Sequence, residues 1–106
     1  MKIELAKSEL IHFVGIGGIG MSGLALIMKE LGFNVQGSDI LNNKNIERLK
    51  KNKVKAIIGH NKQNIKKATI VVISSAIQKS NIEFLEAKKK KLPMYKRGEM
   101  LAHIVS

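Results

Sequence analysis

The 106-residue sequence has no cysteine, no tryptophan, one proline, three phenylalanines and one tyrosine. The absence of cysteine excludes disulfide bonds and cysteine-ligated metal sites. The longest nearly apolar run, Ile70 to Ile77, contains two serines and is far too short to span a bilayer. Lysine and glutamate interrupt the first ten residues, so no apolar signal segment is present there. We therefore expect a cytoplasmic protein with no membrane partner.

Acidic residues are also few, since eight Asp and Glu stand against 19 Lys and Arg and give a formal net charge of +11. Such a charge attracts polyanions, and nucleic acid is the usual example. The basic residues are spread along the chain, however, and few aromatic residues are available to stack on bases. Charge alone supports only nonspecific attraction. We expect no nucleic-acid partner. A basic nucleic-acid-binding domain is nevertheless kept as a third hypothesis, beside the two that are given below.

Short apolar runs alternate with stretches of helical periodicity along the chain. The runs predict strands over residues 11–14, 34–37, 54–58, 69–73 and 93–95, and the periodic stretches predict helices over 18–31, 42–52, 81–91 and 98–105. The helix over 81–91 has its apolar positions at Ile82, Leu85 and Ala87, whereas residues 1–10 are expected to add little to the core. We predict one Rossmann-like domain over 1–106, with a doubly wound, mostly parallel five-stranded sheet of order 3-2-1-4-5 and helices on both faces.

A glycine-rich stretch joins the first predicted strand to the first predicted helix. Gly15, Gly17 and Gly20 have the spacing G-x-G-x-x-G. In that motif the first glycine permits a sharp turn, the second lets the backbone approach a phosphate, and the third lets the helix pack closely on its strand. The free N–H groups and the dipole of the helix N-terminus then form an anion site that suits a diphosphate.

Polar or glycine-rich segments follow four of the predicted strands, and the carboxyl ends of parallel strands meet at one edge of a sheet. Asp39 could accept hydrogen bonds from ribose hydroxyls or could be a turn residue. His60 could lie over a base or bond to it, or could be a surface turn residue, and Ser38 could cap a turn. Ser74 and Ser75 could bind phosphate or base, or could form a serine turn. We expect these segments to border one ligand site.

No catalytic apparatus is apparent in the sequence. His12, His60 and His103 are scattered, no cluster has metal-ligand spacing, and no G-x-x-x-x-G-K-[ST] loop is present for ATP. We therefore expect a binding domain with no catalytic residues, metal or cofactor of its own. The glycine motif and Asp39 are equally consistent with NAD, so an NAD-binding module of an oxidoreductase or regulator is the alternative.

The segment from His12 to Ala25 resembles the N-terminal motif of the muramyl ligase family, in the G-G-x-G-M-S-G form of its alanine-adding members, the UDP-N-acetylmuramate–L-alanine ligases. Three further segments match that family in order and spacing, namely 37–39, 72–77 and 97–102. Gly98 stands where alanine is common in the family. The form of the glycine loop and the S-S-A-I segment favour this family over NAD-binding proteins.

The resemblance implies a cytoplasmic enzyme of peptidoglycan synthesis that joins L-alanine to UDP-N-acetylmuramate through an acyl-phosphate, with ATP and Mg²⁺. In that family the N-terminal domain holds the UDP part of the substrate, a central domain opening with G-T-x-G-K-T binds ATP, and a third domain contributes to binding the amino acid. The central and C-terminal domains are absent from these 106 residues, so we expect this chain alone to bind and not to catalyse.

The resemblance also implies roles for individual residues. The diphosphate would lie on the loop from Gly17 to Gly20 and on Ser22, whereas Asp39 would hold the uridine side and Arg97 would be a further anionic contact. The UDP-sugar-binding residues that we expect are Gly15, Gly17, Gly18, Ile19, Gly20, Ser22, Ser38, Asp39, His60, Ser74, Ser75, Ala76, Ile77 and Arg97.

Overall fold

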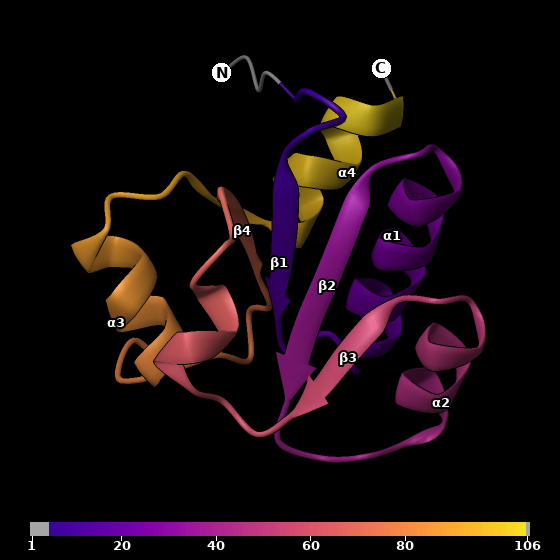
Figure 1. The fold of residues 1–106 in the computed structure, drawn as a ribbon. Coiled ribbons are helices and arrows are strands. Elements are labelled where there is room, and N and C mark those ends of the chain that lie inside the picture. The colour runs from indigo at the N-terminus through magenta and orange to yellow at the C-terminus, as the bar shows by residue number, and fades with distance from the viewer. Residues whose placement is uncertain (1–4, 106) are drawn as a thin grey trace.

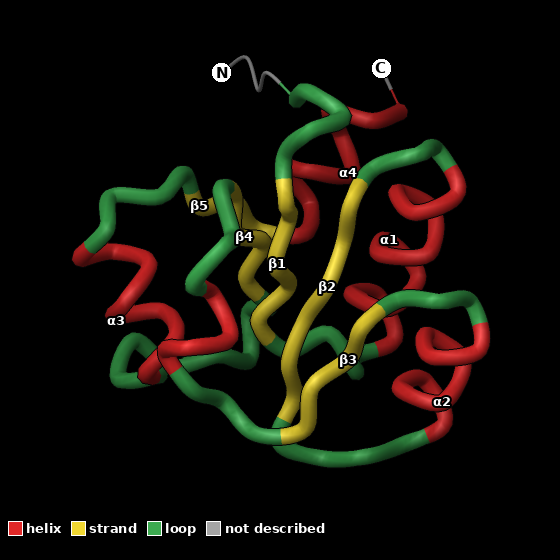
Figure 2. The backbone as a smooth tube through the Cα atoms, viewed as in Figure 1, coloured by secondary structure: helices red, strands yellow, loops and turns green. Residues whose placement is uncertain are grey.

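The computed structural model describes residues 5–105, and its strands and helices alternate as the sequence predicts (Figure 1, Figure 2). The strands are β1 (Leu10–Val14), β2 (Asn34–Asp39), β3 (Lys55–Ile58), β4 (Ile70–Ile73) and β5 (Met94–Lys96). The helices are α1 (Ile19–Glu30), α2 (Lys44–Lys51), α3 (Ile82–Lys89) and α4 (Arg97–Val105). A short 3₁₀ helix, η1 (Lys62–Ile65), lies in a segment where we predicted only a polar connection.

The five strands form one sheet of order β3-β2-β1-β4-β5, and every pair is parallel. Both the predicted order and the predicted direction are confirmed. At the end of β1, Val14 lies opposite Ser38 of β2 and Ile73 of β4. The segments that follow these strands therefore begin at the same edge of the sheet, and Figure 1 shows the arrowheads of β2 and β3 meeting there.

Helices α1, α2 and α4 cover one face of the sheet, while α3 and η1 lie on the other (Figure 1). Alternate residues of β1, among them Ile11 and Phe13, point into the first face and are fully buried. They pack with the apolar stripe of α1, which includes Leu24 and Met28 at a spacing of four residues. This layer forms the main hydrophobic core and fixes the position of the α1 N-terminus at the sheet edge.

The face covered by α3 and η1 is apolar in one half and polar in the other. Its apolar half is a smaller cluster of Val14, Ile65, Ala68, Val71 and Ala87. Its polar half comes from β1 and β2, where His12 and Gln36 lie directly opposite each other and Ser38 follows two residues later. All three of these side chains are buried. A buried polar surface requires hydrogen-bonding partners from the element that covers it.

Helix α3 supplies such a partner, and only one of the three apolar positions that we named on it is buried. Ile82 and Leu85 are 47% and 51% exposed, whereas Glu83 and Ala87 are fully buried. Residues four positions apart lie on one stripe of a helix, so Glu83 and Ala87 face the sheet together. The apolar positions alone therefore do not show which face of α3 lies on the sheet, because this part of the sheet is polar.

Most element ends agree with the prediction to within two residues, and side-chain caps set two of them. Asn43 and Asn81 accept hydrogen bonds from backbone N–H groups in the first turns of α2 and α3. Strand β2 continues to Asp39, two residues beyond the prediction, because Ser38 and Asp39 pair with the end of β3. Residues 1–4 of the expected lead-in lie outside the described part. Within the rest, Leu5 packs against the core and Lys7 Nζ donates to the Leu31 carbonyl.

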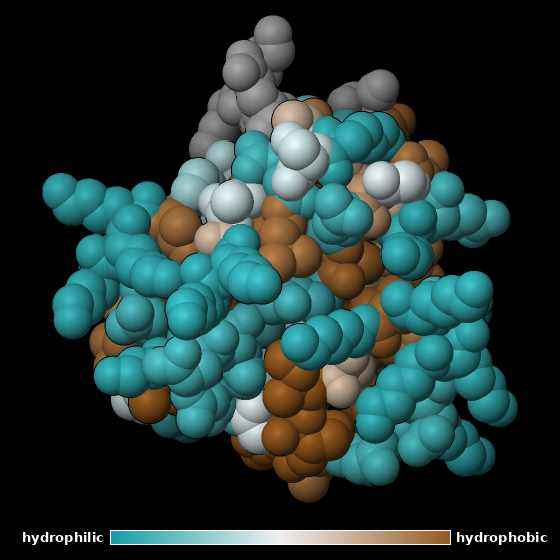
Figure 3. Space-filling model, viewed as in Figure 1, coloured by the Kyte–Doolittle hydropathy of each residue, from teal (hydrophilic) through white to brown (hydrophobic). Residues whose placement is uncertain are grey.

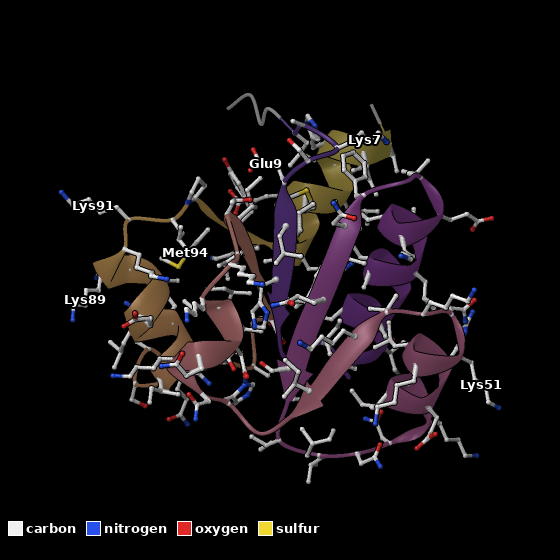
Figure 4. The ribbon with its side chains drawn as sticks, viewed as in Figure 1. Lys7, Glu9, Lys51, Lys89, Lys91 and Met94 are labelled. Atoms are coloured by element: carbon white, nitrogen blue, oxygen red, sulfur yellow. The ribbon has the colours of Figure 1, made fainter. Side chains whose placement is uncertain are left out.

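The surface carries its positive charge on several sides. Figure 4 shows Lys89 and Lys91 on one side of the protein and Lys51 on the opposite side, all pointing outward. Exposed apolar side chains gather at the ends of β2 and β3, where Ile40 and Leu41 are 65% and 66% exposed. The brown surface at the lower centre of Figure 3 lies in this region. No helix among residues 5–105 is long and apolar enough to cross a membrane.

Candidate functional site

The turn after β1 has the geometry that the first glycine of the motif predicts. Gly15 has φ +87°, a conformation that side chains disfavour, and a Cβ there would lie 3.0 Å from the Ser74 Cβ. The N–H groups of Gly15 and Ile16 both donate to the Ser38 carbonyl, at 2.9 and 3.0 Å. This turn leads the backbone from the sheet edge into helix α1, which begins after Gly18.

The N-terminal turn of α1 is exposed and contains no acidic residue that would neutralise the positive end of the helix dipole. The first helical hydrogen bond runs from the Ser22 N–H to the Gly18 carbonyl, at 2.8 Å. The N–H groups of Ile19, Gly20 and Met21 therefore have no carbonyl one turn earlier to bind. No acidic residue lies in this first turn, so the positive end of the helix dipole is available to an anion.

Arg97, the first residue of α4, lies against this turn. A Cβ on Gly20 would be 2.8 Å from Arg97 Cδ and 2.9 Å from Arg97 Nε. We had expected Gly20 to allow close packing on the strand, but its close contact is with the flexible Arg97 side chain. A guanidinium beside free N–H groups strengthens an anion site, because arginine binds phosphate through charge-assisted hydrogen bonds.

Two open clefts flank this turn and share Gly18 and Ser74. The first cleft has a volume of about 420 Å³ and the second about 490 Å³. The expected site residues in the first cleft are Gly15, Gly18, Asp39, His60, Ser74, Ala76 and Ile77. Those in the second cleft are Gly18, Ile19, Gly20, Ser74, Ser75 and Arg97. The structure therefore brings eleven of the fourteen predicted residues to one continuous edge.

Asp39 borders the first cleft and also braces the glycine turn. Its carboxylate accepts hydrogen bonds from the Gly17 N–H at 2.8 Å and from the Leu41 N–H at 3.3 Å. A Cβ on Gly17 would lie 2.9 Å from Asp39 Oδ2, so the close approach at this glycine is to the carboxylate. Gly17 itself is buried and lines neither cleft. Asp39 thus has the turn role that we considered, in a position open to a ligand.

Three of the predicted serines, Ser22, Ser38 and Ser74, use their hydroxyls in hydrogen bonds within the chain. Ser22 is buried and its Oγ donates to the Ile19 carbonyl at 3.2 Å. Ser38 is fully buried and lines neither cleft. Ser74 Oγ accepts from the Ala76 N–H at 3.2 Å, which is the serine turn that we considered. Ser22 and Ser38 therefore do not present their side chains to either cleft.

Beneath the first cleft lies a buried polar network that the sequence analysis missed. Its centre is the Glu83 carboxylate of α3, which is fully buried. Glu83 Oε1 lies 2.6 Å from both His12 Nε2 and Ser38 Oγ. Glu83 Oε2 accepts from the Asn61 N–H at 3.0 Å and from Asn64 Nδ2 at 2.7 Å. The sequence shows only scattered histidines, because the strand order and the packing of α3 bring these residues together.

These contacts hold Glu83 in its ionised form. Burial alone raises the pKa of a carboxyl group. Hydrogen bonds from His12 and Ser38, the electrostatic attraction of His12 and a hydrogen bond from Asn64 outweigh it and lower the pKa of Glu83 from 4.5 to about 2. The four hydrogen-bonded contacts occupy the acceptor sites of the carboxylate. The network therefore joins β1, β2, α3 and the segment after β3. It reaches the first cleft through His60, whose Nδ1 lies 2.9 Å from Ser38 Oγ.

The comparisons with known proteins agree on one family. The chain matches the profile described as Mur ligase family, catalytic domain, over residues 10–106. It is 77% identical over 106 residues to the UDP-N-acetylmuramate–L-alanine ligase of Pelagibacter ubique, covering all of this chain and 23% of that protein. It is 53% identical over 107 residues to the ligase of the same name from Rickettsia typhi, covering 97% of this chain and 22% of that protein.

Solved structures give the same result. The UDP-N-acetylmuramate-alanine ligase MurC of Thermotoga maritima superposes with a TM-score of 0.85 at 32% identity, over 90% of this chain and 22% of that one. The UDP-N-acetylmuramate:L-alanyl-gamma-D-glutamyl-meso-diaminopimelate ligase of Neisseria meningitides superposes with a TM-score of 0.79 at 29% identity, over 88% and 30%. The chain thus spans less than a third of the length of these relatives.

Proposed function

This chain belongs to the Mur ligase family, and from that premise we propose that it is the substrate-binding domain of a UDP-N-acetylmuramate–L-alanine ligase. Its ligand is the UDP part of UDP-N-acetylmuramate. The observation that carries the proposal is the contact of Arg97 with the exposed first turn of α1, at the junction of two clefts. The high identity to ligases of that name supports the choice of substrate.

The diphosphate fits the junction between the clefts. The N–H groups of Ile19, Gly20 and Met21 are free there, and Arg97 supplies a positive charge at the same turn. The helix dipole and the guanidinium would each stabilise the negative charge of a diphosphate. Its two ends then extend into the first and second clefts, which meet at Gly18.

The first cleft suits the nucleoside. Asp39 can accept hydrogen bonds from ribose hydroxyls on the side of its carboxylate that faces the cleft. Ile40 and Ile77 provide apolar walls for a flat base, and His60 provides a ring nitrogen. The second cleft, lined by Ser75 and Arg97 among others, then receives the amino-sugar part. These residues bind and orient the ligand and perform no covalent step.

ATP, Mg²⁺ and L-alanine belong to the proposed activity of the whole ligase, which we place in the cytoplasm. Among residues 5–105 no group of three or more His, Asp or Glu side chains is arranged to hold a metal ion. The sequence also has no phosphate-binding loop of the G-x-x-x-x-G-K-[ST] type. The residues present therefore do not fit ATP or Mg²⁺, and we assign neither to this chain. The chain alone binds its ligand and does not catalyse.

Calorimetric titration tests the proposal. The chain is titrated with UDP-N-acetylmuramate, UDP and NAD, each at a low and a high salt concentration. Saturable binding of both UDP ligands, with none of NAD, is the expected result. Preference for NAD would instead favour a dinucleotide-binding module, and a lack of binding to all three ligands would contradict the proposal. A duplex DNA that binds only at low salt would identify the nonspecific attraction that a charge of +11 produces.

A further inference from the structure

His60 joins the buried network to the first cleft. Its Nδ1 lies 2.9 Å from Ser38 Oγ and 3.4 Å from Glu83 Oε2, so this edge of the ring faces inward. Its Nε2 makes no hydrogen bond to residues 5–105. Every buried side-chain nitrogen and oxygen in that part of the chain has a partner. Since His60 is only partly exposed and lines the first cleft, Nε2 is the atom that it offers to a ligand.

The proton positions in the network can be assigned by starting from groups that can only donate or only accept a hydrogen bond. Gln36 Nε2 donates to the Asn64 carbonyl at 2.7 Å, and a carbonyl can only accept, so this atom is the amide nitrogen. Its other hydrogen points to His12 Nδ1 at 2.8 Å, so Nδ1 is an acceptor. The proton of neutral His12 is therefore on Nε2, and it donates to Glu83 Oε1 at 2.6 Å.

The other oxygen of Glu83 is fixed as an acceptor in the same way. The Asn61 backbone N–H can only donate, and Asn64 Nδ2 also donates to the Gly59 carbonyl, so both bonds to Oε2 carry their hydrogens from the asparagines. Ser38 has one hydroxyl hydrogen, and the carboxylate at 2.6 Å takes it. Ser38 Oγ is then left to accept, and the bond to His60 Nδ1 must carry the histidine's proton.

We infer that buried Glu83, acting through Ser38, fixes the proton of neutral His60 on Nδ1, so that His60 Nε2 accepts a hydrogen bond from the ligand in the first cleft. Glu83 is a positioning residue, since it lines neither cleft. The inference rests on the proposed function, because it specifies how that site selects its ligand. The group it selects is a hydrogen-bond donor, which in a uridine nucleotide is the base N3–H or a ribose hydroxyl.

The substitution Glu83→Gln reverses this arrangement. With its oxygen toward the donors Asn61 and Asn64, the new amide turns its NH₂ toward Ser38 Oγ and leaves the His12 Nε2–H without its acceptor. Ser38 then accepts from the amide and donates its own hydrogen to His60 Nδ1. The His60 proton moves to Nε2, which becomes a donor toward the cleft. Glu86→Gln is the matched control, because Glu86 lies on the same helix and lines neither cleft.

The test combines two readouts on the wild-type chain, Glu83→Gln and Glu86→Gln. Nitrogen chemical shifts of His60, measured without ligand where the ring is neutral, show which ring nitrogen carries the proton. Titrations with UDP, CDP and 2′-deoxy-UDP then give the preference for the donor. CDP replaces the N3–H of the base by an acceptor, whereas 2′-deoxy-UDP lacks one ribose hydroxyl. The loss of one hydrogen bond, or its replacement by two groups that repel each other, corresponds to about a tenfold change in affinity.

We expect wild type and Glu86→Gln to carry the His60 proton on Nδ1. We also expect both to bind UDP about tenfold more tightly than at least one of the two analogues, CDP and 2′-deoxy-UDP. A preference over CDP that is lost in Glu83→Gln identifies the base as the donor to His60. A preference over 2′-deoxy-UDP that is lost in Glu83→Gln identifies the ribose, because a ribose contact with Asp39 would persist in that variant. In Glu83→Gln the proton moves to Nε2 and that preference is lost. A wild-type proton on Nε2, equal affinity for all three ligands, or preferences over both CDP and 2′-deoxy-UDP that are unchanged in Glu83→Gln would overturn the inference.

Two further results separate this inference from the proposed function. If wild type binds none of the nucleotides, the proposed function fails, while the His60 shifts still report on the proton position by themselves. If Glu83→Gln does not fold, Ser38→Ala replaces it. That variant removes the 2.9 Å partner of His60 Nδ1, so a mixture of both neutral forms and about a threefold smaller preference are expected. An unchanged His60 spectrum in Ser38→Ala would contradict the role of Ser38.

Discussion

His12 and Glu83 are 71 residues apart in the sequence, yet His12 Nε2 and Glu83 Oε1 lie 2.6 Å apart with both side chains fully buried. The contact joins the middle of the central strand β1 to the first turn of α3. A buried carboxylate is costly unless hydrogen bonds satisfy it, and this one has bonds to both oxygens. The polar face of α3 is thereby fixed on the sheet, and its apolar residues Ile82 and Leu85 face outward.

The network makes stability depend on acidity. The pKa of Glu83 is lowered from 4.5 to about 2 in the folded protein. Its contribution to the free energy of unfolding is therefore fully present above pH 4.5 and is lost as the pH falls toward 2. The shift corresponds to about 3 kcal/mol. Urea unfolding at a series of pH values should show this loss.

The variant Glu83→Gln tests the assignment of that loss to one group. At neutral pH the variant should unfold with a free energy about 3 kcal/mol lower, because an amide cannot accept from all four donors. Its stability should then fall less between pH 4.5 and 2 than that of wild type. Glu86→Gln should keep the wild-type profile. An equally steep profile in Glu83→Gln would place the acid sensitivity elsewhere.

Gly37 allows β2 to pass close to the glycine turn. A Cβ at this position would lie 2.5 Å from Ile16 Cδ1 and 2.6 Å from the Phe13 carbonyl oxygen. Because one of these neighbours is backbone of the adjacent strand, repacking cannot relieve the overlap. Gly37→Ala should therefore lower the free energy of unfolding by about 3 kcal/mol. Gly98→Ala is the control, since its Cβ meets nothing within 4 Å and should be neutral or stabilising.

Gly20 provides a test in which stability and binding change differently. Gly20→Ala places a Cβ 2.8 Å from Arg97 Cδ and so displaces the guanidinium from the first turn of α1. Alanine favours the helix by up to about 1 kcal/mol, so thermal stability should be nearly unchanged. Affinity for UDP, measured by calorimetry, should fall about tenfold. Gly23→Ala, in the same helix with open space around it, should retain wild-type affinity.

Gly17 tests whether the position of Asp39 matters for the ligand. Gly17→Ala would bring a Cβ 2.9 Å from Asp39 Oδ2 and 3.2 Å from Ile46 Cδ1. The carboxylate must then shift, and the 2.8 Å bond from the Gly17 N–H is weakened. We expect a stability loss of about 1 kcal/mol and a larger relative loss of affinity for UDP. A folded variant that binds UDP as wild type does would argue against a ligand role for this pair.

Much of the fold was predictable from local patterns. The alternation of apolar runs with helical periodicity predicts parallel strands joined by crossover helices, and the structure has the predicted strand order. The sharp turn at Gly15 also followed from the residue type. Such features depend on neighbours in the chain, so the sequence displays them directly. The glycine-rich turn and the polar segments at the sheet edge were predictable for the same reason.

The contacts between distant segments were not predictable from those patterns. Gly20 is opposite Arg97 because α4 packs beside α1, and Gly17 is opposite Asp39 because β2 is next to β1. The inward position of Glu83 depends on the polar residues that β1 and β2 present to α3. By itself the sequence determined where the chain turns and which strands neighbour each other, since local propensity and connection rules govern both. Only the tertiary structure decided which side chains meet, because hydrogen bonds between segments depend on distances that no spacing in the chain encodes.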